Sequence, residues 1–462
     1  MAVKNVLKVS TNAELLSYII NQNPILSDEI ELPVQGQDIR PIGKLIMDNE
    51  RYRNAFINTV NIIGLTVIKR NRWENPWDFT VRGTLTRGQT IREIIVDLCN
   101  VHSYNENVNN VTKFLETEVP NVLNYMHNIN FQVYYQTTTS DEQLAMAFET
   151  EGGLLTFIEE SVSMLWESKV YDEYIIDKYM LCRRILDGTM TSIEIEDFDT
   201  KTARERVSDM KSISNKITFR SPDYNPAGIR RATSFDNQMF ILNTDFEAAM
   251  STEVLATSFF RDDADFKARA VLCDGFGKHD SERLAEVLKE QYVPFTSEEL
   301  QALSNIPAVI ISREWFMDYY YGMDNSTVGK HTEFYNPTTL KNNHYLHIWG
   351  VKSTSPFENG VVFTAGVAPT VTTVTVSPSE SSLSAGLSLQ LTASITTTGF
   401  ANKAVTWSIT KGAEDGKAKI NESGLLTIAK DYPVSGSAPQ IEVTATSIYN
   451  NTVTGKATIT VL

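Results

Sequence analysis

Residues 83–90 mimic a phosphate-binding loop. That motif has two glycines five positions apart, then Lys and Ser or Thr, because backbone N–H groups cradle the phosphates while the Lys reaches the outer ones. Gln89 stands where the Lys is required, and the apolar run 91–98 favours a strand where the motif needs a helix. We interpret the segment as a hairpin turn and predict no nucleotide or other cofactor.

Three histidines, His331, His344 and His347, invite the hypothesis of a metal site. In a strand, side chains three positions apart point to opposite faces, so His344 and His347 cannot converge on one ion without a bulge. We interpret all three as ordinary half-buried histidines near Trp349 and predict no metal ligand.

Catalytic motifs are weak along the chain. Residues 274–277 (DGFG) resemble the metal-binding turn of kinases, but no Gly-rich loop or HRD-type segment accompanies them. Cys99, Cys182 and Cys273 are far apart and favour buried thiols in a reducing compartment. We predict no catalytic residue and no enzyme.

Arginines and tryptophans gather in one segment. Five Arg lie within 23 positions of an otherwise acidic chain, and two Trp lie among them. Because Arg makes bidentate, orienting contacts with carboxylates, we expect this segment to face an adjacent copy of the chain. The predicted contact residues are Arg70, Arg72, Trp73, Trp77, Arg82, Arg87 and Arg92.

Charge and hydropathy narrow the class of protein. The 462 residues carry a formal charge of −16, which disfavours a general nucleic-acid binder. The longest apolar runs fall well short of the ~20 residues of a membrane span, and no apolar leader is visible at the N-terminus. We expect a cytosolic protein with no membrane partner.

The composition changes sharply near Pro369. Residues 370–462 hold six acidic residues and six Lys, so their net charge is zero and the whole −16 belongs to residues 1–369. Apolar residues alternate with Thr and Ser in the tail, as at Val405, Trp407 and Ile409. This period of two predicts a small β-sandwich, joined to an acidic body.

The body combines helix and strand signals. Apolar residues at helical spacing predict one long helix over 154–187, ended by Gly188. Two apolar runs, 60–68 and 91–98, flank a polar stretch and predict a long hairpin. A two-stranded ribbon is marginally stable alone, so we expect it to lie on a neighbouring subunit. The mixture indicates an α+β body.

Two resemblances to known families follow. The tail stretches "VTTVTVSPSESSLSAGLSLQLTAS", "NKAVTWSIT", "INESGLLTI" and "GKATITV" are similar to the bacterial Ig-like group 2 module. In the body, "IGLTVI", "RGTLTRGQTIREI", "PNVLNYMHNINFQVYYQTTTSDEQLAMAF", "VLCDGFG", "REWFMDYY" and "YLHIWGVKSTSPFENGVVFTAG" resemble the major capsid proteins of small picovirus-type podophages.

The capsid resemblance implies a Hong Kong 97 type fold and a division of the chain. Its expected parts are an N-terminal arm (1–59), an extended hairpin loop (60–100), a peripheral domain (101–200 and 331–366, with spine helix 154–187), an axial domain (201–330) and the Ig-like domain (370–462). Residues 361–364 are expected to return to the peripheral sheet.

The resemblance also implies a function. The subunit is expected to assemble with itself into pentamers and hexamers of an icosahedral shell around phage double-stranded DNA, without sequence-specific binding. Scaffolding and portal proteins are expected partners, and assembly is expected in the host cytoplasm. Two alternatives stay open: a secreted adhesin or surface-layer protein, and a carbohydrate-active enzyme with an Ig-like spacer.

The hairpin hypothesis yields a first prediction. We expect Arg87→Glu to leave the subunit soluble but to impair shell formation, because the reversed charge meets carboxylates of the adjacent copy. Electron microscopy of assembled particles measures this. Particles of normal number and shape would contradict the assignment.

Overall fold

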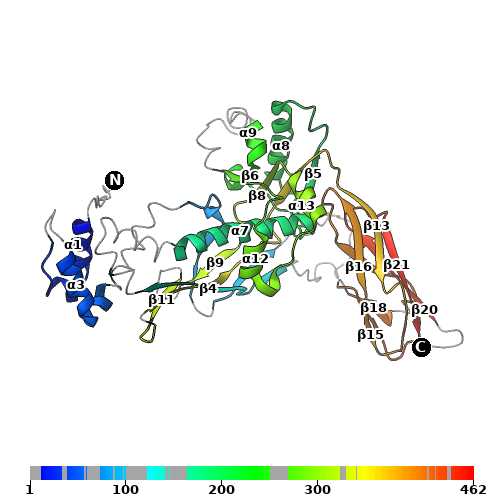
Figure 1. The fold of residues 1–462 in the computed structure, drawn as a ribbon. Coiled ribbons are helices and arrows are strands. Elements are labelled where there is room, and N and C mark those ends of the chain that lie inside the picture. Colours follow the sequence, from blue (N-terminus) through cyan, green and yellow to red (C-terminus); the bar gives the residue numbers. More distant parts are fainter. Residues whose placement is uncertain are drawn as a thin grey trace, which may run out of the picture.

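The computed structural model describes most of the body and nearly all of the tail (Figure 1). The described residues are 12–33, 39–56, 59, 73–86, 89–96, 98–99, 122–140, 145, 164–249, 269–322, 329–339, 341–413, 416–421, 423–433 and 439–462. A small helical unit, an α+β body and a β-sandwich follow one another along the chain.

The N-terminal segment contains a helical unit with a core of its own. It comprises α1 (Asn12–Gln22), α2 (Pro24–Ser27) and α3 (Arg40–Asp48), drawn in dark blue in Figure 1. Leu16, Ile19 and Ile20 recur at helical spacing and are buried against Ile46 and Phe56. The expected arm is therefore partly a folded unit.

Helix α7 (Met164–Leu186) runs through the centre of the body. Its 23 residues span about 34 Å. The helix ends one residue before the end of the predicted helix 154–187, and residues 154–163 lie outside the described part. Gly188, at a φ of +68°, follows the last turn, and a Cβ there would lie 2.3 Å from the Ala401 oxygen.

One sheet of the body is built around a long central strand, β11 (Lys341–Val351). It pairs antiparallel with β4, β10 and β9, and β9 pairs in parallel with β1. The bounds of these strands are β1 Val81–Leu85, β4 Phe131–Ser140, β9 Asp318–Tyr321 and β10 Lys330–Asn336. We call it the long sheet.

The second sheet has the order β5-β12-β8-β6-β7. We call it the compact sheet. Its strands are β5 (Thr191–Ile195), β6 (Gln238–Asn243), β7 (Ala270–Cys273), β8 (Ala308–Ser312) and β12 (Gly360–Ala365). Four helices lie in the same region of the body as this sheet: α8 (Ala203–Ile217), α9 (Thr244–Ala249), α12 (Ser281–Leu288) and α13 (Ser297–Ser304).

Strand β12 contains residues 361–364, which are expected to return to the peripheral sheet. It pairs with β5 and β8, whereas β9, from the expected axial segment, joins the long sheet. Val362 packs in the cluster around α7, and Val361 and Phe363 pack in the cluster with α8. A strand that is apolar on both faces requires a sheet covered on both sides, which the compact sheet provides.

The C-terminal region is a β-sandwich, which confirms the predicted Ig-like architecture. Its sheets are β13-β16, β14-β21-β20-β17 and β15-β19-β18. Alternating residues such as Ile441, Val443 and Ala445 fill its core. The strands are β13 Thr370–Ser377, β14 Glu380–Leu383, β15 Ser388–Gln390, β16 Thr392–Thr398, β17 Val405–Lys411, β18 Ala418–Ile420, β19 Leu425–Ile428, β20 Gln440–Ser447 and β21 Thr454–Val461.

The sandwich packs against the C-terminal end of α7. Phe400 is buried within the core cluster of the body. The Lys403 ammonium donates to the Leu186 carbonyl oxygen at 2.6 Å, at the helix C-terminus. A cation there satisfies an end carbonyl and complements the helix dipole. The linker therefore does not separate two independent bodies.

A buried charge cluster joins α7 to the long sheet. The Lys352 ammonium lies 2.8 Å from Asp177 Oδ1 on α7 and 2.7 Å from Asp318 Oδ2 on β9. Thr80, just before β1, donates its hydroxyl to Asp177 Oδ2 at 2.7 Å. Both carboxylates are fully buried, and the Lys352 side chain is 3% exposed.

The protonation equilibria of this cluster reflect its burial. Burial raises the pKa of Asp318 well above its ordinary value, and the charge of Asp177 raises it further. Burial alone would lower the pKa of Lys352, but the two aspartates outweigh it and raise that pKa. The cationic Lys352 thus compensates a buried acidic pair.

We predict that Lys352→Met lowers the free energy of unfolding by about 3–5 kcal/mol, because two buried carboxylates lose their counter-ion. Chemical denaturation of the unassembled subunit measures this. The control is Lys201→Met, which breaks a half-exposed pair with Asp209 and should cost far less, since solvent screens that pair. Equal losses in both variants would contradict the role of the cluster.

Candidate assembly surface

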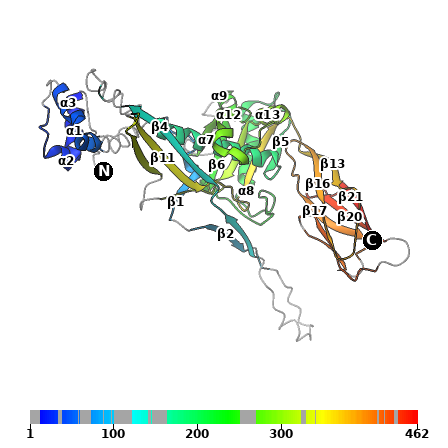
Figure 2. The same cartoon turned by 60° about the horizontal axis from the view of Figure 1, so that its bottom comes forward.

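A two-stranded ribbon projects from the body (Figure 2). It consists of β2 (Ile91–Val96) and β3 (Val122–His127), paired antiparallel. The predicted hairpin 60–100 placed the run 91–98 against 60–68. The structure instead pairs it with β3, and residues 60–72 lie outside the described part.

The two faces of the ribbon differ in exposure. Ile94 and Val96 are 57% and 59% exposed, and the partner-strand residues Val122 and Met126 are 49% and 46% exposed. The register places all four on one face. Exposed apolar side chains gathered on a marginally stable ribbon make this face a candidate contact surface.

The base of the ribbon is fixed to the body. The buried His127 ring lies with Nδ1 2.9 Å from Ser353 Oγ and with Nε2 3.0 Å from Glu93 Oε2. Three residues later, the Asn130 side-chain amide donates to the Lys352 carbonyl at 2.6 Å, and its oxygen accepts the Lys352 N–H at 2.8 Å. The ribbon is therefore anchored beside the buried charge cluster.

Two of the predicted contact residues are exposed. Arg92 lies on the apolar face of the ribbon, with Nη2 3.9 Å from Met126 Sδ. Trp73 is 51% exposed and its edge contacts the Tyr174 ring at a centroid distance of 5.7 Å. Arg70, Arg72 and Arg87 lie outside the described residues.

Trp77 corrects the prediction for its position. Its side chain is fully buried in its own chain, where the indole N–H donates to the Leu272 carbonyl at 3.0 Å. Its ring packs at 5.5 Å from Tyr174 and 6.1 Å from Phe316. It is a core residue that immediately precedes the 3-10 turn Asp78–Thr80, and its buried ring leaves no surface for a neighbour to contact.

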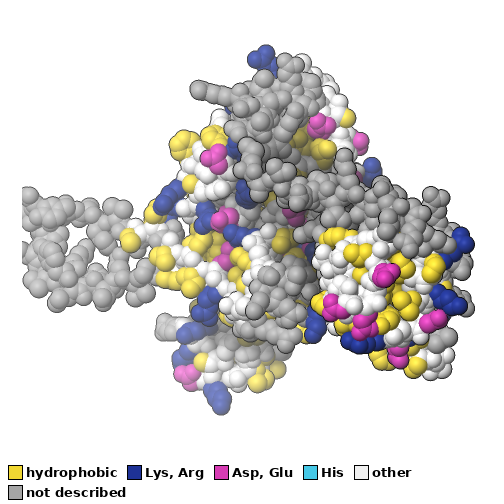
Figure 3. Space-filling model, turned by 90° about the vertical axis from the view of Figure 1, so that its left-hand side faces the viewer, with side chains coloured by type: hydrophobic (Ala, Val, Ile, Leu, Met, Phe, Trp, Pro, Cys, Tyr) yellow, Lys and Arg dark blue, Asp and Glu magenta, His cyan; other side chains and the backbone are white. Residues whose placement is uncertain are grey.

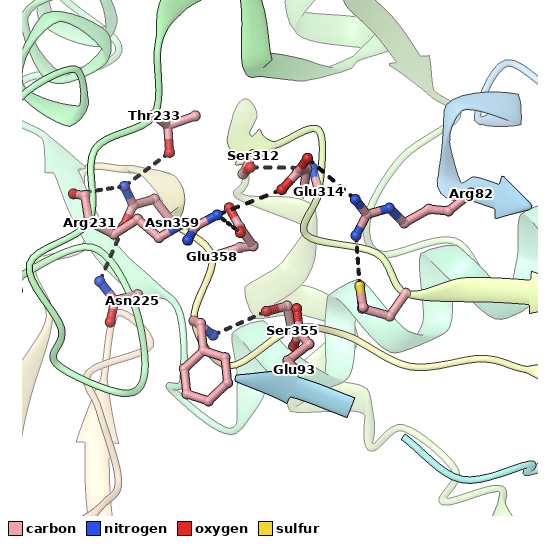
Figure 4. A network of polar contacts seen from close by, with 12 residues as sticks. Arg82, Glu93, Asn225, Arg231, Thr233, Ser312, Glu314, Ser355, Glu358 and Asn359 are labelled. Atoms are coloured by element: carbon pink, nitrogen blue, oxygen red, sulfur yellow. Dashed lines mark hydrogen bonds and ion pairs between the residues drawn. The ribbon is translucent and has the colours of Figure 1, made fainter. Parts of the chain in front are cut away.

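Arg82 also differs from the expectation, because its carboxylate partner lies within the same chain (Figure 4). Its Nη2 lies 3.4 Å from Glu314 Oε1. Glu314 also approaches Arg231 at 3.6 Å, and Arg231 pairs with the buried Glu358. Arg82 therefore ties β1 of the long sheet to the segments that flank β8 and β12 in the compact sheet.

The second strand of the ribbon was missed by sequence reasoning. The signal for it is the short run of Val122, Leu123, Tyr125 and Met126 after Pro120. This run lacks the strict alternation that identifies a half-buried strand. Its pairing with β2 is set by register and by the His127 anchor, neither of which is local in the sequence.

One face of the described surface is mixed in charge. Figure 3 shows acidic and basic side chains interspersed with apolar ones over the described part of one face. Within the described ranges, no helix is both long enough and apolar enough to cross a bilayer.

The sequence pattern of the family described as "Phi29-like phage major capsid protein" matches residues 26–364, well over half of the chain. This chain belongs to that family. The pattern of the bacterial Ig-like domain (group 2) matches residues 370–462. Both predicted resemblances are thereby confirmed, with the boundary between them where the composition changes.

Two capsid proteins of Bacillus phages match this chain along nearly its whole length. The major capsid protein of Bacillus phage PZA is 28% identical over 434 residues, covering 92% of this chain and 89% of that one. That of Bacillus phage GA-1 is 28% identical and covers 99% and 94%. The capsid structure of Staphylococcus phage Andhra has a TM-score of 0.48 at 13% identity, covering 64% of this chain and 86% of that chain.

The chain is a major capsid protein, a structural component of the phage head shell. The family is structural and not enzymatic, which confirms the prediction that the chain is not an enzyme. This membership favours the capsid hypothesis over an adhesin, a surface-layer protein or a carbohydrate-active enzyme. Cys182 and Cys273 are buried free thiols as predicted, whereas Cys99 is exposed.

The kinase-like turn has a structural role in the capsid subunit. Asp274 accepts hydrogen bonds from Lys178, at 2.5 Å, and from Tyr174, both on α7. Burial raises the pKa of Asp274, but these two donors outweigh it and lower that pKa below its usual value. In the segment 83–90, which mimics a phosphate-binding loop, the Gln89 side-chain oxygen accepts a hydrogen bond from the Thr86 N–H at 3.1 Å, as in a closed turn.

His279 follows the turn and is held neutral. Its Nε2 lies 2.8 Å from the Phe276 carbonyl oxygen, and its ring stacks on Phe295 at 4.4 Å. Burial, with the nearby charge of Lys178, lowers the pKa of His279 from 6.5 to about 4. The unfolded chain binds a proton near pH 6.5, so stability is present above that pH and is lost as pH falls toward 4.

We predict that the free energy of unfolding contributed by His279 falls by about 2 kcal/mol between pH 7 and pH 5. Urea denaturation of the unassembled subunit at both pH values measures the loss. His279→Gln keeps an N–H donor but does not titrate, so it should lose about 2 kcal/mol less than the natural chain. Identical losses would show that His279 does not titrate in this range.

Proposed function

We propose that the subunit assembles through its ribbon, whose apolar face docks on an adjacent copy. Each fully buried Ile or Val contributes about 1.5–3 kcal/mol, so covering Ile94, Val96 and Val122 favours association. The exposed Arg92 on the same face would then pair with a carboxylate of that copy. The exposure of this face is the observation that supports the proposal.

The same contact, repeated by rotation, closes subunits into rings. A head-to-tail interface generates closed rings when the rotation permits it, and pentamers and hexamers of one subunit build an icosahedral shell. Much of the stability of the ribbon is then stability of the assembly, because its apolar face is covered only there.

The enclosed cargo is phage double-stranded DNA, held without sequence-specific contacts. The formal charge of −16 supports this part of the proposal, since an acidic subunit repels the phosphate backbone and does not bind it tightly. Scaffolding and portal proteins are the further partners proposed, and host cytoplasm is the proposed place of assembly.

The test introduces charge into the ribbon face. We predict that Ile94→Asp with Val96→Asp reduces the yield of shells at least tenfold, because two buried carboxylates oppose docking. Negative-stain electron microscopy counts shells in cells that produce the subunit with the phage's other head proteins. Circular dichroism of the purified variant verifies that the subunit itself is folded.

The matched control keeps both positions apolar. Ile94→Leu with Val96→Ile should form shells in normal number, since both positions stay apolar and change in size by at most one methylene. Shell formation by the aspartate variant at the level of this control would overturn the proposed docking.

A further inference from the structure

Three potential metal ligands converge on the β10–β11 hairpin. His331 and Glu333 lie on β10, and His344 lies on β11 directly opposite Glu333. Glu333 Oε1 is 3.8 Å from Nδ1 of His331 and 3.8 Å from Nδ1 of His344. The ligand atoms of the three residues all lie within 4.8 Å of one another.

The register explains why these residues meet. Residues two apart on a strand share a face, so His331 and Glu333 point the same way, and cross-strand pairing adds His344. His347, three positions further, points to the other face and lies 3.1 Å from Thr332 Oγ1. The histidine pair considered from sequence is thus separated, while a different pair is brought together.

One nitrogen of each of the two histidine rings lacks an ordinary hydrogen bond. Within the part of the chain that the structure describes, His344 Nδ1 and His331 Nε2 are buried without a hydrogen-bond partner. Buried polar atoms are normally satisfied, so an unsatisfied pair on neighbouring rings calls for a ligand. The His344 side chain is only 2% exposed, and those of His331 and Glu333 are 18% and 19% exposed.

Surrounding side chains hold the ligands in place. Thr139 Oγ1 on β4 lies 2.9 Å from His344 Nε2, which leaves Nδ1 directed at Glu333. The Asn342 amide donates to Glu333 Oε2 at 3.3 Å, which leaves Oε1 directed at the two rings. His344 and Glu333 thus each have their far atom fixed by a hydrogen bond, as ligands in protein metal sites commonly do.

We propose that His331, Glu333 and His344 bind one divalent zinc ion. Two imidazoles and one carboxylate are a ligand set that suits zinc, with a fourth position left for water. Bond lengths of about 2.0–2.2 Å in a tetrahedron place neighbouring ligand atoms about 3.3 Å apart. The observed 3.8 Å separations therefore close by about half an ångström when the ion binds.

The ion would secure the edge of the long sheet. Among the described strands, β10 pairs only with β11 and ends the sheet. A metal bridge from β10 to β11 fixes the register of this edge strand and blocks slippage. Binding of the ion would thus stabilise this edge, and the stabilisation grows with the logarithm of the free zinc concentration.

The experiment uses the full-length subunit freed of metal by chelation and dialysis. We expect calorimetry to show that this subunit binds one equivalent of Zn²⁺. We also expect its melting temperature to rise when Zn²⁺ is added. With Co²⁺ as a spectroscopic probe, we expect the visible absorption of a tetrahedral site. Glu333→Gln preserves the bond with Asn342 and should weaken Zn²⁺ binding at least tenfold, and His344→Ala should abolish stoichiometric binding.

His347→Ala is the matched control, since it removes a histidine of the same strand from the opposite face. It should bind Zn²⁺ as the natural chain does. The proposal is overturned if the natural chain retains no stoichiometric Zn²⁺, or if Glu333→Gln binds it as tightly as His347→Ala. Circular dichroism of each variant separates loss of binding from loss of the fold.

Discussion

The architecture of the subunit depends on one buried ammonium group held between two carboxylates. Lys352 joins Asp177 of the central helix to Asp318 of the long sheet. Its backbone N–H donates a hydrogen bond to the Asn130 side chain at the base of the ribbon. Ionic contacts in a dry interior tolerate little displacement, since an unpaired charge there is costly. Helix, sheet and ribbon are thereby held in one geometry.

This arrangement separates internal stability from association. Trp77, Trp315 and Phe316 are buried in the core around α7. The ribbon carries its apolar residues on an open face instead. A subunit built this way has a core of its own and leaves apolar surface exposed on the ribbon. Arg82 illustrates the same separation, because its charge is compensated by Glu314 inside the chain.

Local patterns predicted part of this structure. The alternation in the tail, the spacing of Ile175, Tyr179 and Cys182 and the stop at Gly188 depend on neighbouring residues, and the tail sandwich and the end of α7 follow from them. The pairing of β2 with β3 and the sheet of β12 depend on distant partners and could not be deduced. The His331–Glu333–His344 group likewise requires a cross-strand register that the sequence does not display.

The contact between the sandwich and α7 has a consequence for the orientation of the C-terminal domain. Phe400 and Lys403 hold the tail module against the last turn of α7. The orientation of the module is therefore set by the direction of that helix. A peptide fused after Leu462 would therefore start from a module whose orientation relative to the body is the same in every copy. No change to the linker is needed to keep that orientation constant.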